Sequence, residues 1–167
     1  MELNGLLAKF PTKIKVLIGA FLVVLSIGFY TGLLFVNETS SAKPTSIEEH
    51  YLGNENKEEA SVMKFKKSPK EMLTIVHTHI LSMSFIFFFI GLILVTTKLN
   101  SRLKLFLMIE PFASVLLTFG GIYFLWKGLL WFKYIVILSG VLMTLTFTVS
   151  TLIIFSQLIK KNNEICQ

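Results

Sequence analysis

The chain has 167 residues, of which 53% are hydrophobic, and its mean hydropathy of +0.70 is far above that of a soluble domain of this length. Lysine and arginine number 16 against 10 acidic residues, a net charge of +6, but the basic residues stand between apolar runs instead of forming one surface stripe. The composition therefore indicates an integral membrane protein in contact with a lipid bilayer and argues against nucleic acid as a partner. A single cysteine, Cys166, excludes an intramolecular disulfide.

A basic leader at residues 1–15 precedes an uncharged apolar run at residues 16–36, which we predict to be the first transmembrane helix. A signal peptide is the alternative, because small residues that suit cleavage follow at 40–42, but the run exceeds the roughly 7–15 residues of a signal-peptide core. Gly28 and Gly32 form a Gly-x-x-x-Gly step in this run. That step predicts close helix packing, within the chain or against another subunit.

Residues 37–67 are the only long polar segment, and we expect them to form an outer loop folded over the mouth of the bundle. Within it, residues 45–53 are typical of a short helix that begins at serine or threonine and ends at Gly53. The second transmembrane helix is predicted at 69–97, since Ser68 and Glu71 form a capping box and proline suits the first helical position.

The remaining chain is predicted to form an inner loop at 98–104, a third transmembrane helix at 105–126, an outer turn at 127–133, a fourth transmembrane helix at 134–159 and a cytoplasmic tail at 160–167. Short connections force neighbouring helices to run in opposite directions. We therefore predict an all-α membrane protein, an antiparallel bundle of four transmembrane helices with one long outer loop. Basic residues divide evenly between the two sides, but those of the loop at 37–67 are diluted by glutamates. This distribution favours cytoplasmic termini and a periplasmic loop.

No charged side chain lies between Met72 and Thr97, yet the first turns of this helix carry polar groups that need partners. These intramembrane polar residues are Thr74, His77, Thr78, His79, Ser82 and Ser84. On a helix, His77 and His79 point about 200° apart and cannot both bind one ion. His77 shares an arc with most of the hydroxyl side chains, so we expect it to face the bundle interior. His79 is then expected to face a neighbouring helix, the headgroup zone or another subunit.

Three interpretations of these histidines remain open. Both rings can hydrogen-bond within a small wet pocket at the rim, or a titrating imidazole can relay protons. The third interpretation is a haem b or metal-ion site, whose candidate ligands are His77, His79 and the loop residue His50. Met108 or Met143 could complete a haem site.

Glu110 is the only acidic residue inside a predicted span, which makes it a functional candidate. The alternative is an ion pair with inner-side Lys98, Arg102 or Lys104, beside a helix kink at Pro111. Glu110 and the histidines approach the membrane from opposite ends of their helices. We expect them to lie more than roughly 10 Å apart along the membrane normal, which is too far for a shared metal site.

Four short motifs are the basis of a resemblance that covers roughly residues 45–112. They are Tyr51-x-Gly53-x-Glu55, Phe65-x-Lys67-Ser68, His77-x-His79 and Pro111-Phe112. The chain resembles uncharacterised four-span bacterial inner-membrane proteins with a His-x-His motif near the start of the second span. The resemblance implies a bacterial inner-membrane location, an external long loop and a link to respiratory or haem proteins.

The sequence contains no nucleotide-binding loop, no nucleophile with an adjacent base and no paired catalytic carboxylates. We therefore predict a non-enzymatic accessory subunit of a larger inner-membrane complex, which the resemblance links to respiratory proteins. The alternative is a haem-b or metal-binding transmembrane redox protein that uses His77 with His79 or His50.

Overall fold

The computed structural model describes residues 3–40, 43–55 and 62–159, which form helices and connecting segments without strands. In chain order the elements are η1 (Leu6–Lys9), α1 (Thr12–Ser40), α2 (Pro44–Leu52), α3 (Pro69–Val95), α4 (Ser101–Val115), η2 (Leu116–Gly120), α5 (Gly121–Trp126) and α6 (Phe132–Ile159). The predicted tail at 160–167, with Cys166, and part of the predicted outer loop lie outside the described residues.

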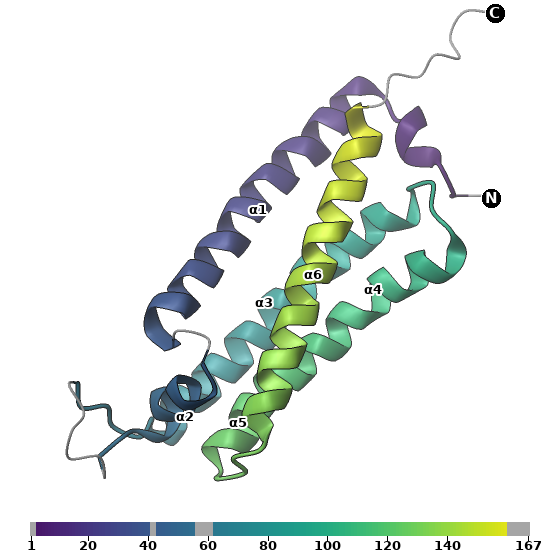
Figure 1. Cartoon of the computed structure of the whole chain (residues 1–167). Coiled ribbons are helices and arrows are strands. Elements are labelled where there is room, and N and C mark those ends of the chain that lie inside the picture. Colours follow the sequence, from purple (N-terminus) through teal and green to yellow (C-terminus); the bar gives the residue numbers. More distant parts are fainter. Residues whose placement is uncertain (1–2, 41–42, 56–61, 160–167) are drawn as a thin grey trace, which may run out of the picture.

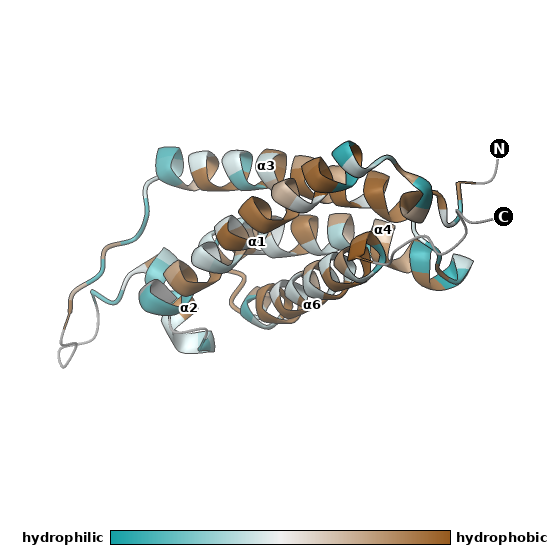
Figure 2. Cartoon of the chain, turned by 90° about the horizontal axis from the view of Figure 1, so that it is seen from above, coloured by the Kyte–Doolittle hydropathy of each residue, from teal (hydrophilic) through white to brown (hydrophobic). Residues whose placement is uncertain are grey.

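Four helical segments are long and apolar enough to cross a membrane. They are Thr12–Glu38, Pro69–Val95, Ser101–Trp126 and Phe132–Ile159. Residues along these helices are mostly hydrophobic, and the most hydrophilic residues gather at the two ends and in the connections (Figure 2). The prediction of an all-α, four-span membrane protein is confirmed.

The two ends of the bundle have different structures (Figure 1). At one end η1, the α3–α4 connection and the last turns of α6 meet, because Leu7 N donates to Thr96 O at 2.9 Å and Lys98 N donates to Gln157 Oε1 at 2.7 Å. At the other end α2 contacts α1, α5 and α6. The described parts of the long loop therefore lie at the end opposite η1.

The start of α3 has the predicted capping box. Ser68 Oγ accepts from Glu71 N at 3.3 Å, and Ser68 N donates to Glu71 Oε2 at 2.7 Å. These two bonds satisfy backbone groups that have no partner in the first helical turn. The residue at which the polar segment ends and α3 begins is thus fixed by the local sequence.

The third span is one helical run with a π-helical segment, η2, between α4 and α5. Pro111 lies inside α4, so the break in regular hydrogen bonding comes five residues later than the predicted irregularity beside this proline. Thr118 of η2 is hydrogen-bonded through its hydroxyl to Ser139 of α6 at 2.7 Å. A π-helical turn that places a buried polar residue against another helix is a frequent feature of functional sites.

The helices are packed unequally. In the most apolar stretch of α1, 11% of the residues are buried, whereas the corresponding values are 44% in the third span and 39% in α6. The closest ring contact between α1 and α6 is between Phe29 and Phe147, which stack with centroids 3.8 Å apart. At the next residue of each helix, the hydroxyl groups of Tyr30 and Thr148 lie 2.8 Å apart. The core is therefore formed mainly by α3, α6 and the third span, with α1 attached at its side (Figure 1).

The short helix α2 begins differently from the prediction. Pro44 occupies the first helical position and Lys43 precedes it without a side-chain cap, whereas we expected a serine or threonine cap. Gly53 ends the helix as predicted, with φ 82°. Glu48 forms a salt bridge to Lys133 at 2.8 Å, which ties α2 to the start of α6.

The strap that follows α2, residues 62–68, returns along the same end of the bundle. Asn54 and Lys64 are joined by hydrogen bonds, and Trp126 Nε1 donates to Lys67 O at 2.8 Å. Lys66 Nζ lies 5.3 Å from the centre of the Trp126 ring. We call α2 together with residues 53–55 and 62–68 the lid.

Candidate functional site

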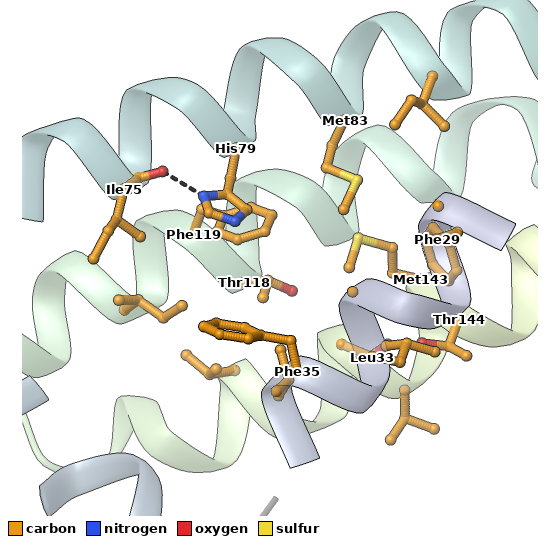
Figure 3. Close-up of a pocket in the computed structure, with 18 of the residues that line it drawn as sticks. Phe29, Leu33, Phe35, Ile75, His79, Met83, Thr118, Phe119, Met143 and Thr144 are labelled. Atoms are coloured by element: carbon orange, nitrogen blue, oxygen red, sulfur yellow. Dashed lines mark hydrogen bonds between the residues drawn. The ribbon is translucent and has the colours of Figure 1, made fainter. Parts of the chain in front are cut away.

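A cavity of about 900 Å³ lies between α1 and the helical core, under the lid. Its lining is mainly aliphatic, aromatic and thioether side chains, with a few polar groups from α2, α3, η2 and α6 (Figure 3). Small-molecule and cofactor sites are typically concave, apolar and supplied with a small number of polar groups. The cavity therefore has the size and lining of a binding site for an apolar molecule.

His79 is the polar side chain that α3 contributes to the cavity lining (Figure 3). Its ring stacks on Phe119 with centroids 4.8 Å apart, and its Nδ1 lies 2.7 Å from Ile75 O. A carbonyl oxygen can only accept, so in the neutral imidazole the proton is on Nδ1 and the lone pair is on Nε2. The backbone of α3 thereby fixes Nε2 as an acceptor or a metal ligand.

The prediction that His77 faces the interior is wrong. Both rings are exposed, but His77 lies outside the cavity lining, whereas His79 borders the cavity. Within the predicted polar arc, Thr74 Oγ1 bonds to α3 itself, donating to Lys70 O at 2.9 Å. Ser82, outside the arc, likewise donates through Oγ to His79 O at 3.4 Å. Thr78 is exposed and Ser84 is half-buried. A hydroxyl bonded to its own helix needs no interior partner.

His50 and its neighbour Tyr51 line the same cavity from the lid. Burial, with Lys67 and Lys64 nearby, lowers the pKa of His50, so its neutral form is favoured. Burial raises the pKa of Tyr51 to about 12, which keeps its hydroxyl protonated. Two histidines thus border the cavity, and they are His50 and His79 rather than the sequence neighbours His77 and His79.

The lowered pKa of His50 predicts a lid that opens in mild acid. With the lid open, His50 has its ordinary pKa near 6.5; with the lid closed, the pKa is lower. The closed state therefore loses stability as pH falls below about 6.5, because protonation favours the open lid. We expect faster proteolysis of the loop at pH 5.5 than at pH 7.5. In His50→Gln, assayed with the same protease at each pH, this difference should disappear, and an unchanged pH effect in that variant would assign it to another group.

Glu110 lies apart from the cavity lining. It accepts a short hydrogen bond from Ser114 Oγ, one turn along α4, and its other carboxylate oxygen is buried without a partner in the described part of the chain. The predicted ion pair with inner-side basic residues is not what the structure has. Lys104, for example, donates to Asn4 and to the carbonyls of Val95 and Thr97.

Gly28 and Gly32 line the cavity from α1. A Cβ atom added at either glycine would have no neighbour within 4 Å, so none of the described helices packs tightly on them. The predicted close packing within the chain is therefore corrected. The missing side chains instead leave space in the cavity.

Metal ligation is restricted by the donor set. The described residues contain no group of three or more His, Cys, Asp or Glu side chains that could hold a metal ion. Met143 lines the cavity, farther along it than His79, and Met108 packs against the hydrophobic core elsewhere. The described residues therefore do not provide the three or four protein ligands of a typical zinc site.

Sequence reasoning missed the residues of η2, Thr118 and Phe119, which complete the wall around His79. A signal was present in the order Thr118-Phe119-Gly120-Gly121, a polar residue and two glycines within an apolar span. Gly121 is where α5 approaches α6 closely, since a Cβ there would lie 2.9 Å from Val136 Cγ2. This small-residue contact accompanies the π-helical turn that presents Thr118 and Phe119.

The fold defines a multi-pass helical membrane protein in contact with the lipid bilayer. A family model described as a transmembrane helical domain matches residues 41–165, so the chain belongs to this family, Aq_1264_TM. The match covers the lid and the three helices of the core and begins after α1. No curated protein and no solved structure matches the chain.

Proposed function

We propose that the protein is a non-enzymatic accessory subunit of a larger membrane complex and that α1 is its docking helix. The observation that carries the proposal is the weak burial of α1 in comparison with the third span. Val23, Ile27 and Leu34 are 48%, 61% and 65% exposed and lie outside the cavity lining. They share one face at helical spacing, and such a face can pack against a helix of a partner subunit.

A photo-crosslinking residue at Ile27 or Leu34 tests the docking helix in native membranes. We expect a protein adduct of one defined mass at both positions and migration of the wild-type chain in a complex larger than a monomer. Leu138 and Leu152 of α6 are exposed to a similar extent and serve as matched positions. Migration as a lone monomer at all salt concentrations, or the same adducts from α6, would count against the proposal.

We further propose a bacterial inner-membrane location with cytoplasmic termini and a periplasmic lid. The basic residues Lys98, Arg102 and Lys104 lie in or just after the short α3–α4 connection, at the end that holds η1, which supports that end as cytoplasmic. The family match supports a membrane location, and the resemblance to bacterial inner-membrane proteins supports the inner membrane of a bacterium.

Cysteine labelling tests this orientation. In a chain whose native Cys166 is replaced by serine, Glu55→Cys should react with an impermeant thiol reagent in intact cells and Ser101→Cys should not. Both positions are exposed, so access depends on the side of the membrane. Labelling of Ser101→Cys from outside would reverse the orientation.

A second candidate function is haem-b or metal binding in a transmembrane redox protein. The observation that favours it is the Nδ1 hydrogen bond of His79, since metal-ligating histidines commonly donate their other ring N–H to a backbone carbonyl. His79, with His50 or Met143, would hold the haem or metal, and His77 would take no part. A bound haem would supply one-electron chemistry.

The absorption spectrum of the purified protein tests the second candidate. If this second candidate is correct, the spectrum has a Soret band that His79→Ala removes and His77→Ala preserves. A colourless protein without stoichiometric metal would eliminate this candidate and leave the accessory role untouched.

A further inference from the structure

The hydroxyl of Thr118, at the cavity wall, already donates its proton in a hydrogen bond within the protein. Ser139 Oγ donates its only proton to Ile135 O, 2.7 Å away, so the 2.7 Å contact between Thr118 and Ser139 must have Thr118 as its donor. Thr118 Oγ1 can then offer a ligand only lone pairs.

The same holds for the other polar groups on the inner part of the lining. Thr144 Oγ1 donates to Gly140 O at 2.9 Å, and His79 has its proton on Nδ1, bonded to Ile75 O. Among the described lining residues below the lid, the polar groups are thus all acceptors toward the cavity. A molecule that satisfies them must bring its own donor.

The depth of His79 in the membrane means that an unsatisfied acceptor at Nε2 would cost free energy. At about 1.5 Å per residue, His79 lies roughly 15 Å along α3 from Pro69, which places it within the hydrocarbon region of a bilayer. No water is available there to satisfy an exposed acceptor. No hydrogen-bond partner of His79 Nε2 occurs among the described residues.

The apolar part of the lining indicates what carries the donor. Phe35 and Phe119 lie on either side of the space below His79, with the thioethers of Met83 and Met143 farther along (Figure 3). Aromatic rings and thioethers make favourable contacts with a flat aromatic group. The open space over Gly28 and Gly32 continues the cavity along α1 and suits an alkyl tail.

We propose that the cavity binds an apolar molecule with an aromatic hydroxyl head, of the phenol or hydroquinone class, whose O–H donates to His79 Nε2. The ring lies between Phe35 and Phe119, and the tail extends along Gly28 and Gly32. This inference goes beyond the accessory role and does not rest on it.

The test compares 4-decylphenol with 4-decylanisole, because one carries the donor proton and the other a methyl group in its place. Equilibrium dialysis against nanodiscs with and without the whole protein measures how tightly the protein binds each probe. We expect about tenfold tighter binding of the phenol, the value of one hydrogen bond. His79→Phe keeps a ring against Phe119 and should abolish the preference, whereas His77→Phe should retain it. Gly32→Leu, which has open space for its side chain, should weaken both probes.

A measurement on the wild type makes the result independent of how the variants fold. The ¹⁵N resonance of His79 Nε2 should shift with 4-decylphenol and not with 4-decylanisole, and that of His77 should not respond to either. Equal binding of the two probes, equally tight binding of 1-dodecanol, or a Soret band from a haem already in the cavity would each overturn the proposal.

Discussion

Replacing Phe147 with alanine should lower the free energy of unfolding by about 3–5 kcal/mol, the usual cost of removing a buried phenylalanine. Phe147 is fully buried in α6 and stacks on Phe29 of α1, with Phe87 of α3 and Tyr30 of α1 at its edges. It therefore joins three elements where α1 has few other contacts. We expect α1 to separate from the core before the other helices unfold.

Unfolding in mixed micelles with increasing dodecyl sulfate measures the overall loss. The reactivity of a cysteine placed at Thr148, whose hydroxyl lies 2.8 Å from that of Tyr30 in α1, reports the attachment of α1: in a chain with Cys166 replaced by serine, it should react faster with a thiol reagent in the Phe147→Ala variant. Val149→Ala, two residues away and 40% exposed, is the control and should cost less than about 1 kcal/mol. A loss as small as this in Phe147→Ala would show that α1 is held by other contacts.

The four spans could be predicted from the sequence because each needs only a long apolar run and a marked end. The capping box of Ser68 and Glu71 and the glycine after α2 gave the ends of two helices correctly, since these signals act within one turn. The first span extends past the predicted residues 16–36 at both ends. The length of an apolar run predicts that a span is present better than it predicts the residues at which the span begins and ends.

The orientation of α3 could not be predicted, and the reason is physical. A polar arc indicates an interior face only if its side chains need partners on other helices. Thr74 and Ser82 bond to carbonyls of α3 itself, so they place no constraint on its rotation. Packing against Phe119 and the space beside α1 decide instead that His79, not His77, borders the cavity.

Two polar contacts of the third span were also not predicted from the sequence. The partner of Glu110 is its neighbour Ser114, although three basic residues were available nearer the membrane surface. The third span changes its hydrogen bonding at η2, where Thr118 meets Ser139, and not beside Pro111. The contact of Glu110 with Ser114 is local, one turn along α4, whereas the contact of Thr118 with Ser139 depends on how the third span and α6 are aligned, which no local motif records.

Substitution of Gly53 should have the second large effect, because this residue connects α2 to the returning strap. Its φ of 82° with ψ of 175° is a conformation reserved for glycine. An added Cβ would also lie 2.7 Å from Lys66 N and 2.8 Å from Lys64 O, and these are backbone atoms that cannot rotate away. We expect Gly53→Ala to destabilise the lid by about 3 kcal/mol, from strain together with the displaced hydrogen bonds of Asn54.

Gly128→Ala separates the two causes, since Gly128 has φ 102° but open space around its Cβ position. This control carries the strain without the collision, lies outside the lid, and should leave the lid closed. Limited proteolysis of the long loop measures the outcome: Gly53→Ala should be cut faster than wild type while the transmembrane helices keep their circular dichroism. Because Ile47, His50 and Tyr51 roof the cavity from α2, the same variant should also lose affinity for the apolar probes. Unchanged proteolysis in Gly53→Ala would mean that the strap does not hold α2 in place.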